Sequence, residues 1–162
     1  MHLDRTIDEI DATILDLLQD NARIPQAEIA RAVGLAPSAV LERVRKLESR
    51  GVIHGYAALV EPRAVDRSML AFIAVRSAEM PGDDSVARAL AQCPEVLELH
   101  HIAGEDCYLL KVRARDAEHI GQLLRHRFGR IPGVRSTRTT IVLGTVKETP
   151  RLPVRMLEDE PR

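Results

Sequence analysis

The sequence predicts an α+β fold, in which an N-terminal winged-type helix-turn-helix precedes a C-terminal ferredoxin-like βαββαβ domain. Apolar residues recur every three or four positions at first and every second position from Val52 onward, which indicates helices followed by strands. After residue 69 the expected order is strand, helix, strand, strand, helix, strand, the split βαβ pattern. We therefore expect a helix-turn-helix domain at 1–52, a strand and linker at 53–68, the ferredoxin-like domain at 69–148 and a flexible tail at 149–162.

Three helices are expected in the first third of the chain. The first has Asp8 placed to cap its start, and its apolar stripe consists of Ile7, Ile10, Ile14, Leu17 and Leu18. The second is short and is closed by Gly34. Proline is common in the first turn of a helix, so Pro37 begins the third, which ends before Gly51.

The remaining two thirds are expected to form strands and two helices. Strands are expected at residues 52–60, 70–76, 96–102, 107–112 and 134–142, and helices at 85–92 and about 117–128. The two helices would cover one face of the sheet and leave the other open, and an open apolar face would be a natural subunit contact. The tail contains three prolines and mixed charge, which favours a flexible segment.

Composition excludes several classes of protein. Apolar residues make up 45% of the 162 residues and charged residues 29%, which is ordinary for a globular chain and excludes general disorder. No apolar run reaches the roughly 18 residues of a membrane span, and no secretory signal is expected. Two cysteines, Cys93 and Cys107, provide neither a disulfide framework nor a zinc site. The default is therefore a reduced, cytoplasmic protein without a membrane partner.

Charge is separated within the first third, although the net charge of the whole chain is only −1. Residues 22–50 contain six Lys and Arg against three Glu, whereas residues 1–21 contain one Arg against six Asp and Glu. A basic third helix can be attracted to phosphates despite a neutral total. Aromatic residues are only 2% of the chain, which argues against a stacking platform for single strands or RNA. Double-stranded DNA is therefore the expected nucleic acid.

The outward face of the third helix supplies the candidate contacts. Ser38, Ala39 and Glu42 lie early in the helix, where side chains of a recognition helix reach base edges. The basic side chains further along the helix, Arg43, Arg45 and Lys46, suit contacts with phosphates. Arg23 and Pro37 complete the DNA-binding candidates. The alternative is an ordinary solvated helix face with internal ion pairs such as Glu42–Lys46.

Nine segments resemble, in order, the Lrp/AsnC (feast/famine) family of transcriptional regulators. In the first part these are IDEIDATIL (7–15), NARI (21–24), GLAPSAV (34–40), RVRKLE (43–48) and GVIHGY (51–56). In the second part they are VLELHHIAGE (96–105), YLLKV (108–112), PGV (132–134) and TRTTIVL (137–143). The resemblance extends from about residue 3 to residue 148, and the ordered set is specific although no single segment is decisive.

The resemblance implies a sequence-specific DNA-binding regulator that is modulated by an amino acid or a related metabolite. It implies homodimers, assembled further into tetramers or octamers, and an effector near the turn at 103–106. Cys107 stands where many amino-acid-responsive members have Asp, and the nearby carboxylates here are Glu105 and Asp106. The effector candidates are Ile102, Ala103, Gly104, Glu105, Asp106, Thr139 and Thr140.

The sequence is compatible with two other functions. Some proteins of this two-part architecture resemble siroheme decarboxylases, in which His100 or His101 would serve as a proton donor or a ligand. Another possibility is a metabolite sensor that does not bind DNA. The sequence has no nucleophile–base pair, carboxylate dyad or phosphate loop, so we expect no catalytic residue and no cofactor. Adjacent residues on a strand point to opposite faces, so His100 and His101 cannot share a metal, and no metal site is expected.

Overall fold

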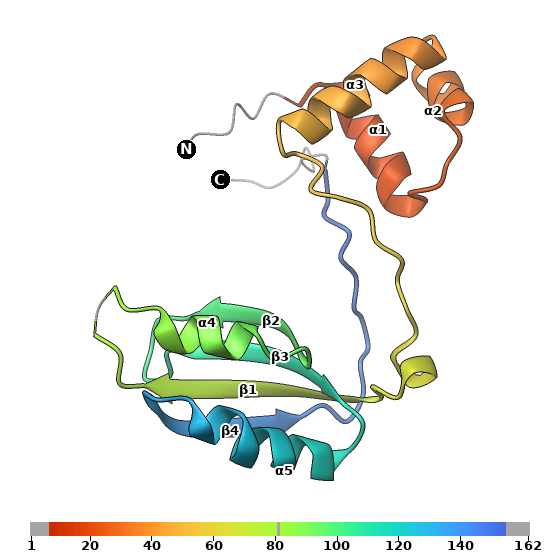
Figure 1. The fold of residues 1–162 in the computed structure, drawn as a ribbon. Coiled ribbons are helices and arrows are strands. Elements are labelled where there is room, and N and C mark those ends of the chain that lie inside the picture. Colours follow the sequence, from red (N-terminus) through yellow and green to blue (C-terminus); the bar gives the residue numbers. More distant parts are fainter. Residues whose placement is uncertain (1–6, 81, 155–162) are drawn as a thin grey trace, which may run out of the picture. The chain divides into compact units, whose positions relative to one another are not determined.

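The computed structural model describes residues 7–80 and 82–154 (Figure 1). The chain divides into two compact units. The helical unit comprises the described residues up to Ala58 together with those from Glu148 onward. The sheet unit comprises Leu59–Lys147. Each unit has its own apolar core, as the change in periodicity along the sequence predicts.

The helical unit contains α1 (Glu9–Asp20), α2 (Gln26–Val33) and α3 (Pro37–Ser49). The expected cap is confirmed, since Asp8 Oδ1 accepts a hydrogen bond from the N–H of Asp11 at 2.7 Å. Gly34 ends α2 with φ of +69°, a conformation that favours glycine. The three helices share one core, whose buried members are Ile14, Leu15, Ile29, Ala30, Val40, Val44 and Leu47.

The strand expected at residues 52–60 is not formed, and this prediction is wrong for the single chain. The N–H groups of Val52 and Ile53 both donate to the carbonyl of Leu47, at 2.9 and 3.2 Å, and so complete the C-terminal cap of α3. Residues 54–61 are irregular and have no ladder partner among the described residues. The described part of the helical unit therefore has no strand, and the winged form of the motif is not seen there.

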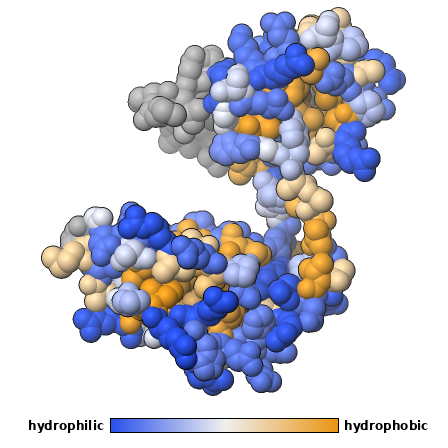
Figure 2. All heavy atoms as spheres, in the orientation of Figure 1, coloured by the Kyte–Doolittle hydropathy of each residue, from blue (hydrophilic) through white to orange (hydrophobic). Residues whose placement is uncertain are grey.

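Apolar side chains are exposed in the segment after α3. Leu59 is 81% exposed and Val60 is 59% exposed. Figure 2 shows orange side chains along this segment, which Figure 1 draws in yellow. An unpaired stretch of this kind retains free N–H and C=O groups together with uncovered apolar surface.

The sheet unit has the expected ferredoxin-like order. Its elements are β1 (Met69–Ser77), α4 (Ser85–Ala91), β2 (Val96–His101), β3 (Tyr108–Ala114), α5 (Ala117–His126) and β4 (Val134–Ile141). The strands lie in the order β2-β3-β1-β4, and all neighbours are antiparallel. Short 3-10 turns at Pro62–Val65 and Phe128–Arg130 precede β1 and β4.

Both helices of this unit lie on the same face of the sheet, as expected (Figure 1). Phe128 is fully buried in the core between helices and strands. The strand residues that point into this core are Ala71, Ile73, Val75, Tyr108, Leu110, Val112 and Ala114. The opposite face mixes apolar and charged side chains, because Phe72 lies in register with Lys111, which pairs with Glu98 at 3.0 Å. This open face is thus more polar than the sequence predicts.

Residues 151–154, which lie within the expected flexible tail, contact α1 in the structure. The backbone of Leu152 makes two hydrogen bonds with the side chain of Gln19. Val154 packs on the core of the helical unit. Local composition could not indicate this contact, because Gln19 and Leu152 are 133 positions apart in the sequence. The rest of the predicted tail, residues 155–162, lies outside the described residues.

Membrane spans and metal clusters are both absent from the part of the chain that the structure describes. None of its helices is long and apolar enough to cross a membrane. No group of three or more His, Cys, Asp or Glu among the described residues is arranged to hold a metal ion.

Substituting Leu110→Ala should destabilise the sheet unit by about 2–5 kcal/mol, because the change leaves a cavity at a fully buried position of β3. Urea denaturation followed by circular dichroism measures the loss. Leu143→Ala is the matched control, since Leu143 is fully exposed and its truncation should stay within about 0.5 kcal/mol. Equal effects of the two changes would contradict the packing described here.

Candidate DNA-binding surface and effector turn

The face of α3 opposite the core carries most of the predicted DNA contacts. Ser38, Glu42, Arg45 and Lys46 are exposed, whereas Val40, Val44 and Leu47 are buried. A helix advances 100° per residue, so the exposed set forms one stripe. Ala39 is half-buried at the edge of this stripe.

The two cations of this stripe are available for an external partner. No ion pair within 4.0 Å holds Arg45 or Lys46 among the described residues. The Glu42–Lys46 pair, which an ordinary solvated helix would favour, is not formed there either. Both cations therefore remain open to phosphates.

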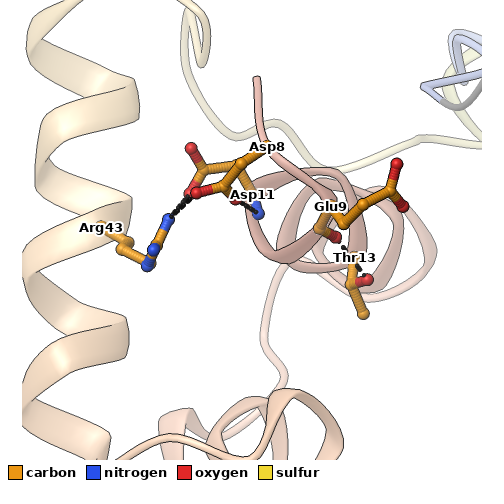
Figure 3. A network of polar contacts seen from close by, with 5 residues as sticks. All are labelled: Asp8, Glu9, Asp11, Thr13 and Arg43. Atoms are coloured by element: carbon orange, nitrogen blue, oxygen red, sulfur yellow. Dashed lines mark hydrogen bonds and ion pairs between the residues drawn. The ribbon is translucent and has the colours of Figure 1, made fainter. Parts of the chain in front are cut away.

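Arg43 differs from its neighbours because it faces α1 (Figure 3). Its Nη1 donates to Asp8 Oδ2 and to Asp11 Oδ1, both at 2.7 Å. Asp11 is 8% exposed, and it is the one buried charged residue among those described. The hydrogen bonds to Asp8 and Asp11 raise the pKa of Arg43, and the Asp11 N–H together with Arg43 lowers the pKa of Asp8. The charge of Arg43 is thus neutralised within the helical unit.

A hollow of about 410 Å³ lies beside this ion-pair cluster. Its lining brings the Asp8 and Asp11 carboxylates together with cations of α3, so it is not a purely basic anion pocket. The complete lining is Asp8, Asp11, Ala39, Glu42, Arg43, Lys46, Leu47 and Arg50.

The remaining two DNA-binding candidates lie at the ends of short connections. Pro37 is exposed and begins α3, and neither Ala36 before it nor Pro25 before α2 forms a side-chain cap. Arg23 is exposed between α1 and α2, and its backbone N–H donates to Asn21 Oδ1 at 2.9 Å. Both therefore flank the exposed stripe of α3 in sequence without being part of it.

The predicted effector turn is a closed loop between β2 and β3. The N–H of Ile102 donates to the carbonyl of Cys107 at 2.9 Å, and the N–H of Cys107 donates to the carbonyl of Val75 at 2.9 Å. Gly104 has φ of +140°, which L side chains rarely adopt, and a Cβ there would meet nothing within 4 Å. Ala103, Gly104 and Glu105 are exposed, so the tip of the turn is accessible.

The two carboxylates of this turn have different surroundings. Asp106 Oδ2 accepts a hydrogen bond from Arg138 Nη2 at 2.5 Å, and the Asp106 side chain is 20% exposed. Glu105 is exposed and has no ion pair among the described residues. Sequence reasoning missed Arg138, since only the pairing of β1 with β4 brings that residue close to the turn.

The two predicted threonines of β4 lie on opposite faces of the sheet. Thr139 is opposite Ile73, which points into the core, whereas Thr140 is opposite Phe72 on the open face. Side chains two positions apart share a face, so Thr140 lies on the same face as Arg138. The structure thus groups Asp106, Arg138 and Thr140, and it separates Thr139 from them.

A hydrogen-bond network supports the base of the turn. Tyr108 donates to Glu79 Oε2 at 2.8 Å, and Glu79 Oε1 accepts the N–H of Val86 at 2.6 Å. Burial and the bond to Glu79 raise the pKa of Tyr108 to about 12. His101 contacts the Tyr108 ring, with centroids 5.2 Å apart, whereas His100 lies near Glu98 on the other face. The expected separation of the two histidines is confirmed.

Comparison with known proteins matches both units to one family. Residues 7–48 match the AsnC-type helix-turn-helix domain, and residues 70–152 match the Lrp/AsnC ligand binding domain. The chain belongs to the Lrp/AsnC family of transcriptional regulators. The expected helix-turn-helix domain followed by a ferredoxin-like domain and the family resemblance are therefore confirmed, and the homologues are DNA-binding regulators.

The matched relatives cover nearly the whole chain. HTH-type transcriptional regulator FL11 of Pyrococcus horikoshii is 40% identical over 149 residues, which is 92% of this chain and 97% of that protein. The leucine-responsive regulatory protein of Escherichia coli is 38% identical over 153 residues, 93% of each chain.

Solved structures agree with this fold. A Neisseria meningitidis transcriptional regulator in complex with L-methionine superposes with a TM-score of 0.86 at 32% identity, covering 92% of this chain and 97% of that one. The feast or famine regulatory protein of M. tuberculosis complexed with L-methionine gives 0.83 at 36% identity, covering 91% and 99%.

Replacing Asp8 with Asn should remove part of the pH dependence of stability. The pKa of Asp8 is lowered by folding, so its charge stabilises the fold above the unfolded pKa near 3.8, and this contribution is lost as pH falls through the lowered folded value. Asn caps helices as well as Asp does, so the change isolates the charge. We expect Asp8→Asn to cost less than about 1 kcal/mol at neutral pH, because the side chain is 52% exposed.

Urea denaturation of wild type and variant at several pH values checks this expectation. The difference between the two proteins should vanish at low pH. Glu9→Gln is the matched control, since it removes a first-turn carboxylate of the same helix that has no ion pair among the described residues, and it should cost less than Asp8→Asn at neutral pH. A difference that persists unchanged at the lowest pH would contradict the role given to the Asp8 charge.

Proposed function

We propose that this Lrp/AsnC regulator binds double-stranded DNA through the exposed stripe of α3. Arg45 and Lys46 contact phosphates, while Ser38 and Glu42 face the base edges, with Ala39 at the margin. The observation that carries this assignment is that Arg45 and Lys46 are exposed and free of ion pairs on the face opposite the core, among the described residues. Arg23 and Pro37 flank that face as further candidate contacts.

The proposal differs from the sequence prediction at Arg43. Its guanidinium is already held by two carboxylates, and contact with a phosphate would compete with both. We infer that Arg43 positions α3 against α1 and does not bind DNA itself. Ion pairs that are partly buried lose much more than surface pairs when one member is removed, so Arg43 contributes to the stability of the motif.

We propose a non-enzymatic role in the cytoplasm, in line with homologues named as transcriptional regulators. Nothing in the comparisons supports a siroheme-decarboxylase-like enzyme, and neither His100 nor His101 lies in a metal-binding group of the described residues. A metabolite sensor without DNA binding would leave the unpaired cations of α3 without a role.

An amino acid is the proposed effector. Solved relatives are complexes with L-methionine, and the turn around Gly104 offers both charges that a zwitterion requires. Glu105 is unpaired among the described residues and can bind the α-ammonium group of the amino acid. Arg138 can bind the α-carboxylate group when that group displaces Asp106 from the guanidinium. Thr140 adds a hydroxyl on the same face. The other candidates contribute by setting the conformation of the turn, for Ile102 and Ala103, and of β4, for Thr139.

We also propose that the chain works as a homodimer, assembled further into a tetramer or octamer. Residues 54–61 have no strand partner within the described chain, and Leu59 and Val60 are exposed there. The same segment of a second copy would satisfy both the backbone groups and the apolar side chains. Two DNA-binding units related by a two-fold axis suit half-sites about 34–36 Å apart.

Removing Arg45 or Lys46 should weaken DNA binding equally across sequences. Each Ala substitution should flatten the slope of log affinity against log salt by about 0.9 for every phosphate that the variant no longer neutralises. Arg43→Ala should leave that slope unchanged and instead lower the unfolding temperature. Fluorescence anisotropy over a salt series and thermal unfolding measure the two effects.

Either of two results would overturn these assignments. A flattened slope for Arg43→Ala with an unchanged unfolding temperature would make Arg43 a phosphate ligand. Unchanged DNA affinity for the double variant Arg45→Ala with Lys46→Ala would remove α3 from the DNA interface and favour the sensor function.

Gly104→Asp should abolish the effector response while leaving basal DNA binding intact, because it places a carboxylate and a strained side chain at the exposed turn. Titrating L-methionine and L-leucine into the protein–DNA complex measures the response. Gly82→Asp is the matched control, since Gly82 also has positive φ (+90°) but lies before α4. A normal dose response in Gly104→Asp would remove this turn from the effector site.

A further inference from the structure

The segment that follows the sheet unit is bound to α1 by reciprocal hydrogen bonds. Gln19 Nε2 donates to the carbonyl of Leu152 at 2.9 Å, and the N–H of Leu152 donates to Gln19 Oε1 at 2.7 Å. One amide side chain thus satisfies both backbone groups of one residue, as a neighbouring strand would. This arrangement fixes the register of the segment on the helix.

Charge complementarity adds to this contact. Arg151 pairs with Asp20 through Nη1 and lies 3.7 Å from Asp16 Oδ1 through Nη2. Both carboxylates belong to the acidic α1, whose last turn has no basic residue of its own. The N–H of Arg151 also donates to Thr149 Oγ1 at 3.1 Å, and this local hydrogen bond restricts the backbone at Arg151.

Apolar packing provides a third and independent contact. Val154 is half-buried and packs on the core cluster formed by α1, α2 and α3. Backbone pairing at Leu152, ion pairs at Arg151 and packing of Val154 therefore hold this segment to the helical unit, although the Leu152 side chain itself is 71% exposed. The described chain from Glu148 onward belongs to that unit.

The return of the chain to the helical unit changes how the two units are connected. The chain leaves the helical unit after Ala58 and rejoins it at Glu148. The returning connection, residues 142–147, directly follows β4, the strand that carries Arg138 and Thr140. The DNA-binding unit thus has two covalent connections to the proposed effector domain.

We propose that residues 151–154 form an intramolecular clasp on α1, which completes the DNA-binding unit and gives β4 a second tether to it. The clasp stabilises α1, whose first turn holds Arg43 and thereby α3. The second tether restricts the orientations of the DNA-binding unit, which raises its effective concentration at a DNA site. The tether part of this inference rests on the proposed DNA-binding function, whereas the clasp itself does not.

Charge reversal tests the clasp without DNA. Arg151→Glu should reduce the hydrogen-exchange protection of α1 amides about five- to tenfold and lower the unfolding temperature by roughly 5 °C. Asp20→Arg combined with Arg151→Glu should restore much of both. Lys147→Glu makes the same charge change at an exposed position outside the helical unit and should change neither. Protection in Arg151→Glu equal to that of wild type would overturn the clasp.

Lengthening the connection tests the tether separately. An insertion of about ten Gly and Ser residues after Gly144 leaves every clasp contact in place and makes the tether slack. We expect α1 protection to stay as in wild type while DNA affinity falls several-fold. Unchanged affinity would overturn the tether. A wild type that does not bind DNA would instead contradict the proposed function, while the exchange measurement would still decide the clasp.

Discussion

The arrangement of the helical unit depends on the ion pairs between Arg43 of α3 and the Asp8 and Asp11 carboxylates at the start of α1. Asp8 caps α1 and, together with Asp11, receives the guanidinium of α3, so one cluster fixes the start of α1 and the rotation of α3. That rotation leaves Arg45 and Lys46 facing outward. The acidic first helix therefore does more than balance charge, because it withdraws Arg43 from the proposed DNA-facing set and holds α1 and α3 together through it.

Sequence reasoning predicted well wherever neighbours along the chain determine the structure. The cap at Asp8, the glycine stops at Gly34 and Gly51, and the strand order of the sheet unit all follow from local pattern. It was wrong at residues 52–60, where alternation predicts a strand but the described chain has no partner for one. The contact of residues 151–154 with α1 could not be predicted from the sequence, because its partner Gln19 is 133 positions away from Leu152.

The candidate sites show the same division. The exposed stripe of α3 could be predicted from helical periodicity, whereas the pairing of Arg43 with α1 required tertiary structure. At the effector turn, Gly104 and the two carboxylates were visible in the sequence. Arg138 was not, because only the register of β4 against β1 brings it to Asp106. The same strand β4 carries Arg138 of the proposed effector site and leads into the returning connection and the proposed clasp.

Fluorescence anisotropy of the protein on the DNA upstream of its own reading frame, compared with scrambled DNA over a salt series, tests the central claim most directly. A sequence-specific regulator should bind the upstream DNA at least about 10³-fold more tightly at physiological salt. Weak binding that is equal for both DNAs and disappears with salt would show only the general attraction of cations to phosphates. That result would contradict the account of α3 as a sequence-specific contact surface at this site.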